Sequence, residues 1–147
     1  FKIRSVKTDI YRTAWVLNEA KDRGMQVGVD MCQNLANPPQ AVNDVVQFIE
    51  QTQNLSGLEM AFVEEAIGPH DTEGFKELRK KTRVAVCGGE IITTPWDMIS
   101  RMRDHVYEFV QPDASVIGGF SALGRSLRHR RRAKSPQLFM LGEGPLQ

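Results

Sequence analysis

Short apolar runs that each end close to an acidic residue recur along the chain, and this repetition constrains the fold more than any other feature. The runs cover residues 25–29, 60–63, 84–89 and 106–112, and the acidic residues that follow them are Asp30, Glu64, Glu90 and Asp113. Stretches with helical periodicity lie between the runs, so the pattern indicates strands and helices in alternation. Parallel strands joined by right-handed helical crossovers are typical of such a pattern.

The expected elements define the fold class. Strands are predicted near 1–4, 26–30, 60–64, 84–87 and 106–110, with a further one near 137–141, and helices near 9–22, 38–51, 72–81, 95–103 and from about 120. We therefore predict an α/β fold, a partial (β/α) barrel of the TIM-barrel type with about six to seven parallel strands and outer helices. A complete barrel takes about 250 residues. Since this chain has 147 residues and starts inside an expected strand at Phe1, we expect a fragment of a longer protein that is inactive by itself.

Composition narrows the classes of partner. Hydrophobic residues make up 41% and charged residues 25% of the chain, which is typical of a globular protein and argues against disorder. A net charge of +1 gives no electrostatic reason to expect nucleic acid or a membrane surface as partner, and no apolar run approaches the roughly 20 residues of a membrane-spanning helix. Two cysteines provide no disulfide framework, which favours a cytoplasmic protein.

Carboxylates at the ends of neighbouring parallel strands suggest a metal site. In a barrel the carboxyl ends of the strands converge on one mouth, so Asp30, Glu64 and Glu90 would meet there as hard oxygen ligands suited to Mg²⁺. Lys2 and Arg4 are two residues apart on one strand and share a face, so they would face the metal across a substrate, with Lys2 as a possible general base. Taken one at a time, each carboxylate could also be a surface or helix-capping group, and the basic pair an ordinary solvated edge.

The region after residue 126 has a different pattern. Residues 127–134 are strongly basic and lack the apolar stripe that a barrel helix needs. Three interpretations remain open: a basic patch for phosphate or nucleic acid, a solvated helix end, or an altered local reading frame. We divide the chain into a barrel domain at 1–126 and an anomalous basic segment at 127–147.

An ordered set of motifs points to a family. The motifs are Lys2-x-Arg4, Val29-Asp-Met-Cys-Gln, Phe62-Val-Glu-Glu-Ala, Gly88-Gly-Glu, and Gln111-Pro-Asp-Ala-Ser followed by Gly118-Gly119. Together they resemble the C-terminal barrel of the enolase superfamily, and most closely its mandelate racemase-like branch, which includes acid-sugar dehydratases. The resemblance covers about residues 1–126.

The resemblance implies a Mg²⁺-dependent enzyme that removes the proton α to a carboxylate. Dehydration of an acid sugar through an enediolate, the reaction of a hydro-lyase, is the favoured activity; the alternatives are a racemase or epimerase, a cycloisomerase, or a barrel that binds metal without turnover. The implied metal ligands are Asp30, Glu64 and Glu90, and Lys2 and Arg4 fall on the family's Lys-x-Lys/Arg motif. The implied partner is a small carboxylate substrate, and the intact protein is expected to be a homo-oligomer.

Three further positions follow from the resemblance. Asp113 would orient a catalytic His on the seventh strand, but the expected position near Met140 carries no His. Cys32 stands where the family often has Asn and could contact metal or substrate, although a small buried thiol is the simpler interpretation. His70 lies in the loop after the second acidic residue and is a candidate substrate contact on its loop position alone.

Overall fold

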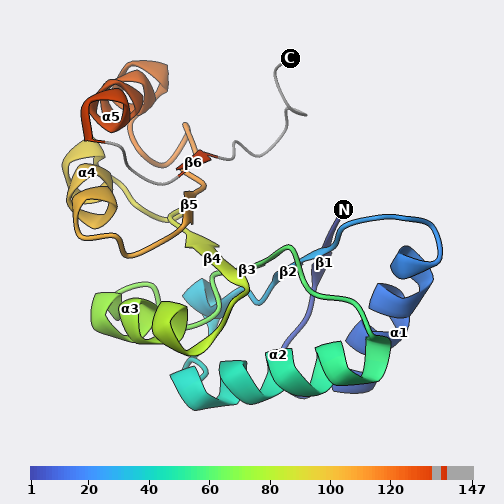
Figure 1. The fold of residues 1–147 in the computed structure, drawn as a ribbon. Helices are drawn as coiled ribbons and strands as arrows, with labels where there is room; N and C mark the ends of the chain where they lie inside the picture. Colours follow the sequence, from blue (N-terminus) through green and yellow to red (C-terminus); the bar gives the residue numbers. More distant parts are fainter. Residues whose placement is uncertain (134–136, 139–147) are drawn as a thin grey trace. The chain divides into compact units, whose positions relative to one another are not determined.

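The computed structural model describes residues 1–133 and 137–138, and Figure 1 shows the alternation of strands and helices along the chain. The chain divides into two compact units, Phe1–Val86 and Cys87–Gln147, and each is described by itself. No helix in the described part of the chain combines the length and the apolar character needed to cross a membrane.

The first unit is built on three adjacent parallel strands. These are β1 (Lys2–Arg4), β2 (Gly28–Asp30) and β3 (Phe62–Glu64), with β1 paired to β2 and β2 to β3. Three α-helices and a short 3₁₀-helix, η1 (Gln33–Leu35), complete the unit: α1 (Ile10–Lys21), α2 (Val42–Ser56) and α3 (Thr72–Lys81). Parallel neighbours connected through helices confirm the predicted alternation.

Burial in the first unit follows the sequence pattern. The central residues of β2 and β3, Val29 and Val63, are fully buried. The helices bury one side each, with Leu17 from α1, Phe48 from α2, and Phe75 and Leu78 from α3. The carboxyl ends of the three strands are therefore set on a packed core.

Helix α2 begins later than the sequence predicted. We expected it to open at Pro38, but Ala41 still has extended backbone (φ −80°, ψ 156°) and the first helical residue is Val42. A residue that precedes a proline is driven out of the helical region, and both Asn37 and Pro38 precede one. The helix also extends to Ser56 rather than to about residue 51 and ends at Gly57, whose φ of +65° suits a glycine terminator.

The second unit contains two parallel pairings. Strand β4 (Ala85–Gly88) begins just before the boundary between the units, and its last residues pair with β5 (Phe109–Val110), which pairs with β6 (Gln137–Leu138). Helix α4 (Pro95–Arg103) starts as predicted, because the Thr94 side chain accepts a hydrogen bond from the Asp97 backbone N–H. Helix α5 spans Phe120–Ala133.

Of the two strands predicted in the second unit, at 106–110 and 137–141, the structure describes two residues each. The strand expected over 106–110 forms only at Phe109–Val110, because the Val106 N–H bonds to the Arg101 carbonyl and so completes the exit from α4. The basic run is helical as far as Ala133. Of the strand expected at 137–141, β6 covers Gln137–Leu138, and the rest lies outside the described residues.

Candidate active site

Strand register brings four of the predicted residues together at one face of the first unit. Arg4 pairs with Asp30, and Asp30 pairs with Glu64. In-register residues of parallel strands point to the same face, so these three side chains form one row. Two residues earlier, Lys2, Gly28 and Phe62 form a second row on the same face, one step toward the amino ends of the strands.

Asp30 is held by contacts to both of its oxygens. It is 2% exposed. Its Oδ1 accepts hydrogen bonds from the Cys32 backbone N–H at 3.0 Å and from the Cys32 thiol at 3.2 Å, and its Oδ2 lies 3.4 Å from Arg4 Nε. Cys32 reaches this position with a left-handed backbone (φ 50°). The turn after β2 therefore orients the carboxylate from one side, and the cation on β1 from the other.

Glu64 receives the ammonium group of Lys2. Glu64 is fully buried, and its Oε2 accepts a hydrogen bond from Lys2 Nζ at 2.7 Å. The same Nζ lies 3.8 Å from Asp30 Oδ2, and the Lys2 side chain is 28% exposed. One ammonium is thus shared by two buried carboxylates from adjacent strands.

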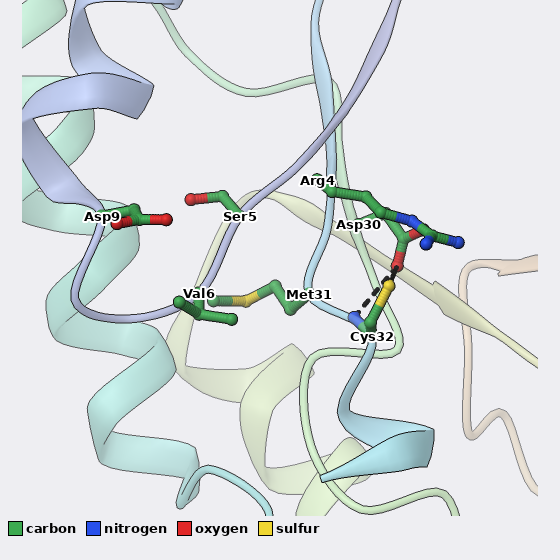
Figure 2. Close-up of a pocket in the computed structure, with 7 residues that line it drawn as sticks. All are labelled: Arg4, Ser5, Val6, Asp9, Asp30, Met31 and Cys32. Carbon is green, nitrogen blue, oxygen red and sulfur yellow. Dashed lines mark hydrogen bonds and ion pairs between the residues drawn. The ribbon is translucent and has the colours of Figure 1, made fainter.

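A cavity of about 290 Å³ lies beside this cluster (Figure 2). It is lined by residues of the β1–α1 loop, the end of β2 and the following turn: Arg4, Ser5, Val6, Asp9, Asp30, Met31 and Cys32. The Arg4 side chain is 76% exposed, so its guanidinium can meet a solute while its Nε remains on Asp30. Cys32 lines the cavity and is half-buried.

Gln40 joins the loops that follow all three strands, a role that the sequence did not predict. Its Oε1 accepts a hydrogen bond from the Lys7 backbone N–H (2.7 Å), and its Nε2 donates to the Ala66 carbonyl (3.0 Å). Its own backbone N–H donates to Gln33 Oε1 (2.7 Å), and Gln33 Nε2 bonds the Met31 carbonyl. No sequence signal distinguishes this glutamine from an ordinary polar loop residue.

The structure separates the roles of the two adjacent glutamates. Glu64 ends β3 on the inner face and pairs with Lys2, and its role as a metal ligand stays a prediction. Glu65 is buried as well, but it has left the strand with a left-handed backbone (φ 43°), and its carbonyl accepts the Gln33 N–H. His70, further along the same loop, is exposed.

Glu90 and Asp113 belong to the second unit. Glu90 follows β4 after Gly89, whose φ is +112°, and is half-buried. Asp113 Oδ1 accepts hydrogen bonds from the Ser115 hydroxyl and backbone N–H at 2.6 and 2.7 Å, and these bonds lower the pKa of the Asp113 carboxyl. The position near Met140 that would carry the partner His lies outside the described residues.

Two of the three predicted metal ligands are therefore neighbours, namely Asp30 and Glu64. Within the described part of the chain, no group of three or more His, Cys, Asp or Glu side chains is arranged to hold a metal ion. Glu90 belongs to the other unit, and its inclusion in the same site stays a prediction.

Comparison with known families identifies the fold. The sequence model of the family described as "Enolase C-terminal domain-like" matches residues 1–136. The chain therefore belongs to the enolase C-terminal domain-like family. The match extends past residue 126, where we placed the domain boundary, and that boundary stays a prediction.

Solved structures with the same fold include three enzymes of this group. They are the 3,6-anhydro-D-galactonate cycloisomerase of Zobellia galactanivorans (17% identity, TM-score 0.79), the L-talarate dehydratase of Polaromonas sp. JS666 complexed with Mg and L-glucarate (18%, 0.78), and a racemase of Streptomyces coelicolor A3(2) with bound magnesium (16%, 0.79). Each similarity covers 97% of this chain but only 38–39% of the other protein. No protein with a curated function matched the sequence.

These comparisons confirm the predicted α/β barrel type and the resemblance to the mandelate racemase-like branch. The chain spans about two fifths of the length of these enzymes. At such low identity the structural similarity shows the fold alone.

Proposed function

We propose that this chain carries part of the active site of an enzyme that removes the proton α to a carboxylate with the help of Mg²⁺, and that the reaction is the dehydration of an acid sugar. The observation that carries the proposal is the buried, in-register pair Asp30–Glu64, with Lys2 and Arg4 as the adjacent cations. The membership of the chain in a family whose solved relatives are dehydratases, racemases and cycloisomerases supports the same reaction class.

The donor set fits magnesium. Asp30 and Glu64 present carboxylate oxygens from neighbouring strand ends, and Mg²⁺ prefers a few such oxygens together with water or substrate. Glu90 is the proposed third ligand. When bound, the ion would neutralise charge that develops on the substrate carboxylate during proton removal.

Arg4 and Lys2 are assigned different roles in this reaction. Arg4 keeps its charge at any physiological pH and cannot act as a base, so we assign it to holding the substrate carboxylate at the cavity, where its guanidinium is exposed. Lys2, one row below on the same face, is the proposed base in its neutral form. Lys2 would take the α-proton, and the β-hydroxyl would leave as water once it has received one proton, so that the protons taken up and released balance. The enol that remains would tautomerise to a 2-keto-3-deoxy acid. Cys32 and His70 remain candidate substrate contacts, and Asp113 a candidate partner of a further acid–base group.

Metal binding is the first test. We expect isothermal calorimetry to show Mg²⁺ binding to the chain, and we expect both Asp30→Asn and Glu64→Gln to weaken it at least tenfold, or ~1.4 kcal/mol. Asp44→Asn is the matched control, because Asp44 is a carboxylate of the same unit whose partner is Lys7 on the outer surface. Equal affinity in all four proteins would contradict the proposed site.

Chemistry is the second test. Proton NMR in D₂O follows loss of the α-proton signal from a panel of acid sugars, with and without Mg²⁺. Because the chain spans 38–39% of the length of the compared enzymes, we expect exchange from a polypeptide that carries this sequence within a complete barrel. Exchange with elimination supports a dehydratase, exchange without elimination a racemase or cycloisomerase, and Mg²⁺ binding without exchange a non-catalytic metal-binding barrel.

A further inference from the structure

Lys2 occupies a position that a divalent ion would contest. Its ammonium lies 2.7 Å from Glu64 Oε2 and 3.8 Å from Asp30 Oδ2. We propose that Lys2 is an internal counter-ion that the metal displaces, so that metal binding itself releases Lys2 toward the substrate. This inference rests on the proposed function, because it takes Asp30 and Glu64 as metal ligands.

The path of the Lys2 side chain explains why one residue can reach both carboxylates. Lys2 is on β1 and Glu64 is on β3, with β2 between them. The β2 residue in register with Lys2 is Gly28, which adds no side chain to the inner face. In place of a β2 side chain, the Phe62 ring of β3 lies over Gly28 in the row of Lys2, and the ammonium ends one row higher, at the carboxylates.

The Lys2 ammonium and a bound divalent ion would compete for the same two carboxylates. Both carboxylates are almost completely buried, so their charges are poorly screened and need a counter-ion. An ion bound to Asp30 and Glu64 would lie within a few ångströms of the Lys2 ammonium, where like charges repel strongly. Since Lys2 is partly exposed, its ammonium can move outward, whereas the buried carboxylates cannot.

This competition has a functional consequence. While Lys2 is bound to Glu64, it is engaged by the protein; when the metal replaces it, the same amine faces the open side of the site, where the substrate would lie. Metal loading would thus free the Lys2 amine to act on the substrate, and an order of binding with metal first and substrate second follows.

Calorimetry on the full chain tests the competition. We expect Lys2→Met to bind Mg²⁺ about tenfold more tightly than the wild type, equivalent to ~1.4 kcal/mol, because the competing ammonium is gone. We expect Lys2→Arg, which keeps the charge, to stay within about threefold of the wild type. Lys7→Met is the control, since it removes a lysine from a surface ion pair with Asp44 and should leave Mg²⁺ affinity unchanged. Circular dichroism establishes that each variant is folded.

A second measurement does not depend on the folding of Lys2→Met. In ¹⁵N-lysine-labelled wild-type protein, the ammonium signal of Lys2 is assigned by its absence from Lys2→Arg and followed as Mg²⁺ is added. A shift of this signal that saturates together with the calorimetric binding supports displacement. If Mg²⁺ binds the wild type and Lys2→Met equally and the Lys2 signal does not move, the displacement is refuted while the metal site stands. If neither protein binds Mg²⁺, the proposed metal site is refuted together with the displacement.

Discussion

Gly28 lies on β2, two residues before Asp30 and in register with Lys2 and Phe62. We expect its replacement by alanine to disturb the candidate site. Gly28 has an ordinary backbone conformation, so the issue is space alone. A Cβ at this position would come closer than 3.0 Å to three carbon atoms of the Phe62 ring. Because Phe62 and Lys2 are the in-register neighbours of Gly28, the ring must move, and the path of Lys2 to Glu64 changes with it.

The magnitude follows from two opposing terms. Over-packing a buried site costs about 1–3 kcal/mol, whereas alanine in place of glycine in a strand gains about 0.5–1 kcal/mol. We therefore expect Gly28→Ala to lower the free energy of unfolding by about 1–2 kcal/mol. Urea denaturation monitored by circular dichroism measures this loss, and with a slope of about 2 kcal/mol/M the midpoint should fall by about 0.5–1 M.

A double-mutant cycle identifies the ring as the cause. In a Phe62→Leu background the ring is absent, so Gly28→Ala should cost at least ~0.5 kcal/mol less than it does alone. Gly124→Ala is the matched control, since the nearest atom to its added Cβ is 3.9 Å away on the side chain of Arg128; it should be neutral or stabilising. The reasoning is refuted if Gly28→Ala unfolds at the wild-type midpoint, or if its cost is the same with and without the Phe62 ring.

Two further outcomes follow from particular hydrogen bonds. Gln40→Ala removes the side-chain bonds to the Lys7 N–H and to the Ala66 carbonyl and leaves the buried Ala66 carbonyl without this donor, so we expect a loss of about 1–3 kcal/mol in urea denaturation. Gln47 is exposed on the next helix, so Gln47→Ala should change stability by less than ~0.5 kcal/mol, and an equal effect of both substitutions would contradict the role of Gln40 in joining the loops. Ser115→Ala removes the hydroxyl bond, which is the largest of the causes that lower the pKa of Asp113, so the pKa of Asp113 should rise toward the usual range in an NMR titration. A carboxyl whose pKa is lowered by folding stabilises the folded state at pH values above its unfolded pKa, and this contribution is lost as the pH falls through the folded pKa. The variant should therefore lose stability at neutral pH and not at strongly acidic pH. An unchanged Asp113 titration would rule out the hydroxyl as a cause.

Local signals account for the parts of the fold that the sequence predicts well. Helix α3 begins after Asp71, whose side chain accepts a hydrogen bond from Gly74 N–H, and α4 begins after Thr94 with Pro95 in its first turn. Each of these caps joins residues that are three apart in the sequence, so the caps can be predicted from the sequence alone. Both helices have the bounds that we predicted, Thr72–Lys81 and Pro95–Arg103.

Features that depend on distant residues could not be predicted in the same way. The start of α2 is set by Gln33, whose side chain holds the Gln40 backbone, and not by the adjacent prolines alone. Gln40 in turn reaches the loops of two other strands. No sequence pattern predicts such a role for a glutamine, because its partners are backbone groups that come together only in the folded chain.

The candidate site lies between these two cases. The end of each strand is a local property, and in-register parallel pairing then places Arg4, Asp30 and Glu64 in one row without further information. The pairing of charges is not local: Arg4 contacts its nearest neighbour Asp30, while Lys2 crosses a strand to a partner 62 residues away. Gly28 adds no side chain to the row of Lys2, and the Phe62 ring lies over it, so we expect the position of that ring, and with it the crossing of Lys2, to depend on this glycine. Gly28→Ala and Lys2→Met therefore both act on the contact between Lys2 and Glu64. We expect Gly28→Ala to weaken this contact, and so to raise the Mg²⁺ affinity as Lys2→Met does.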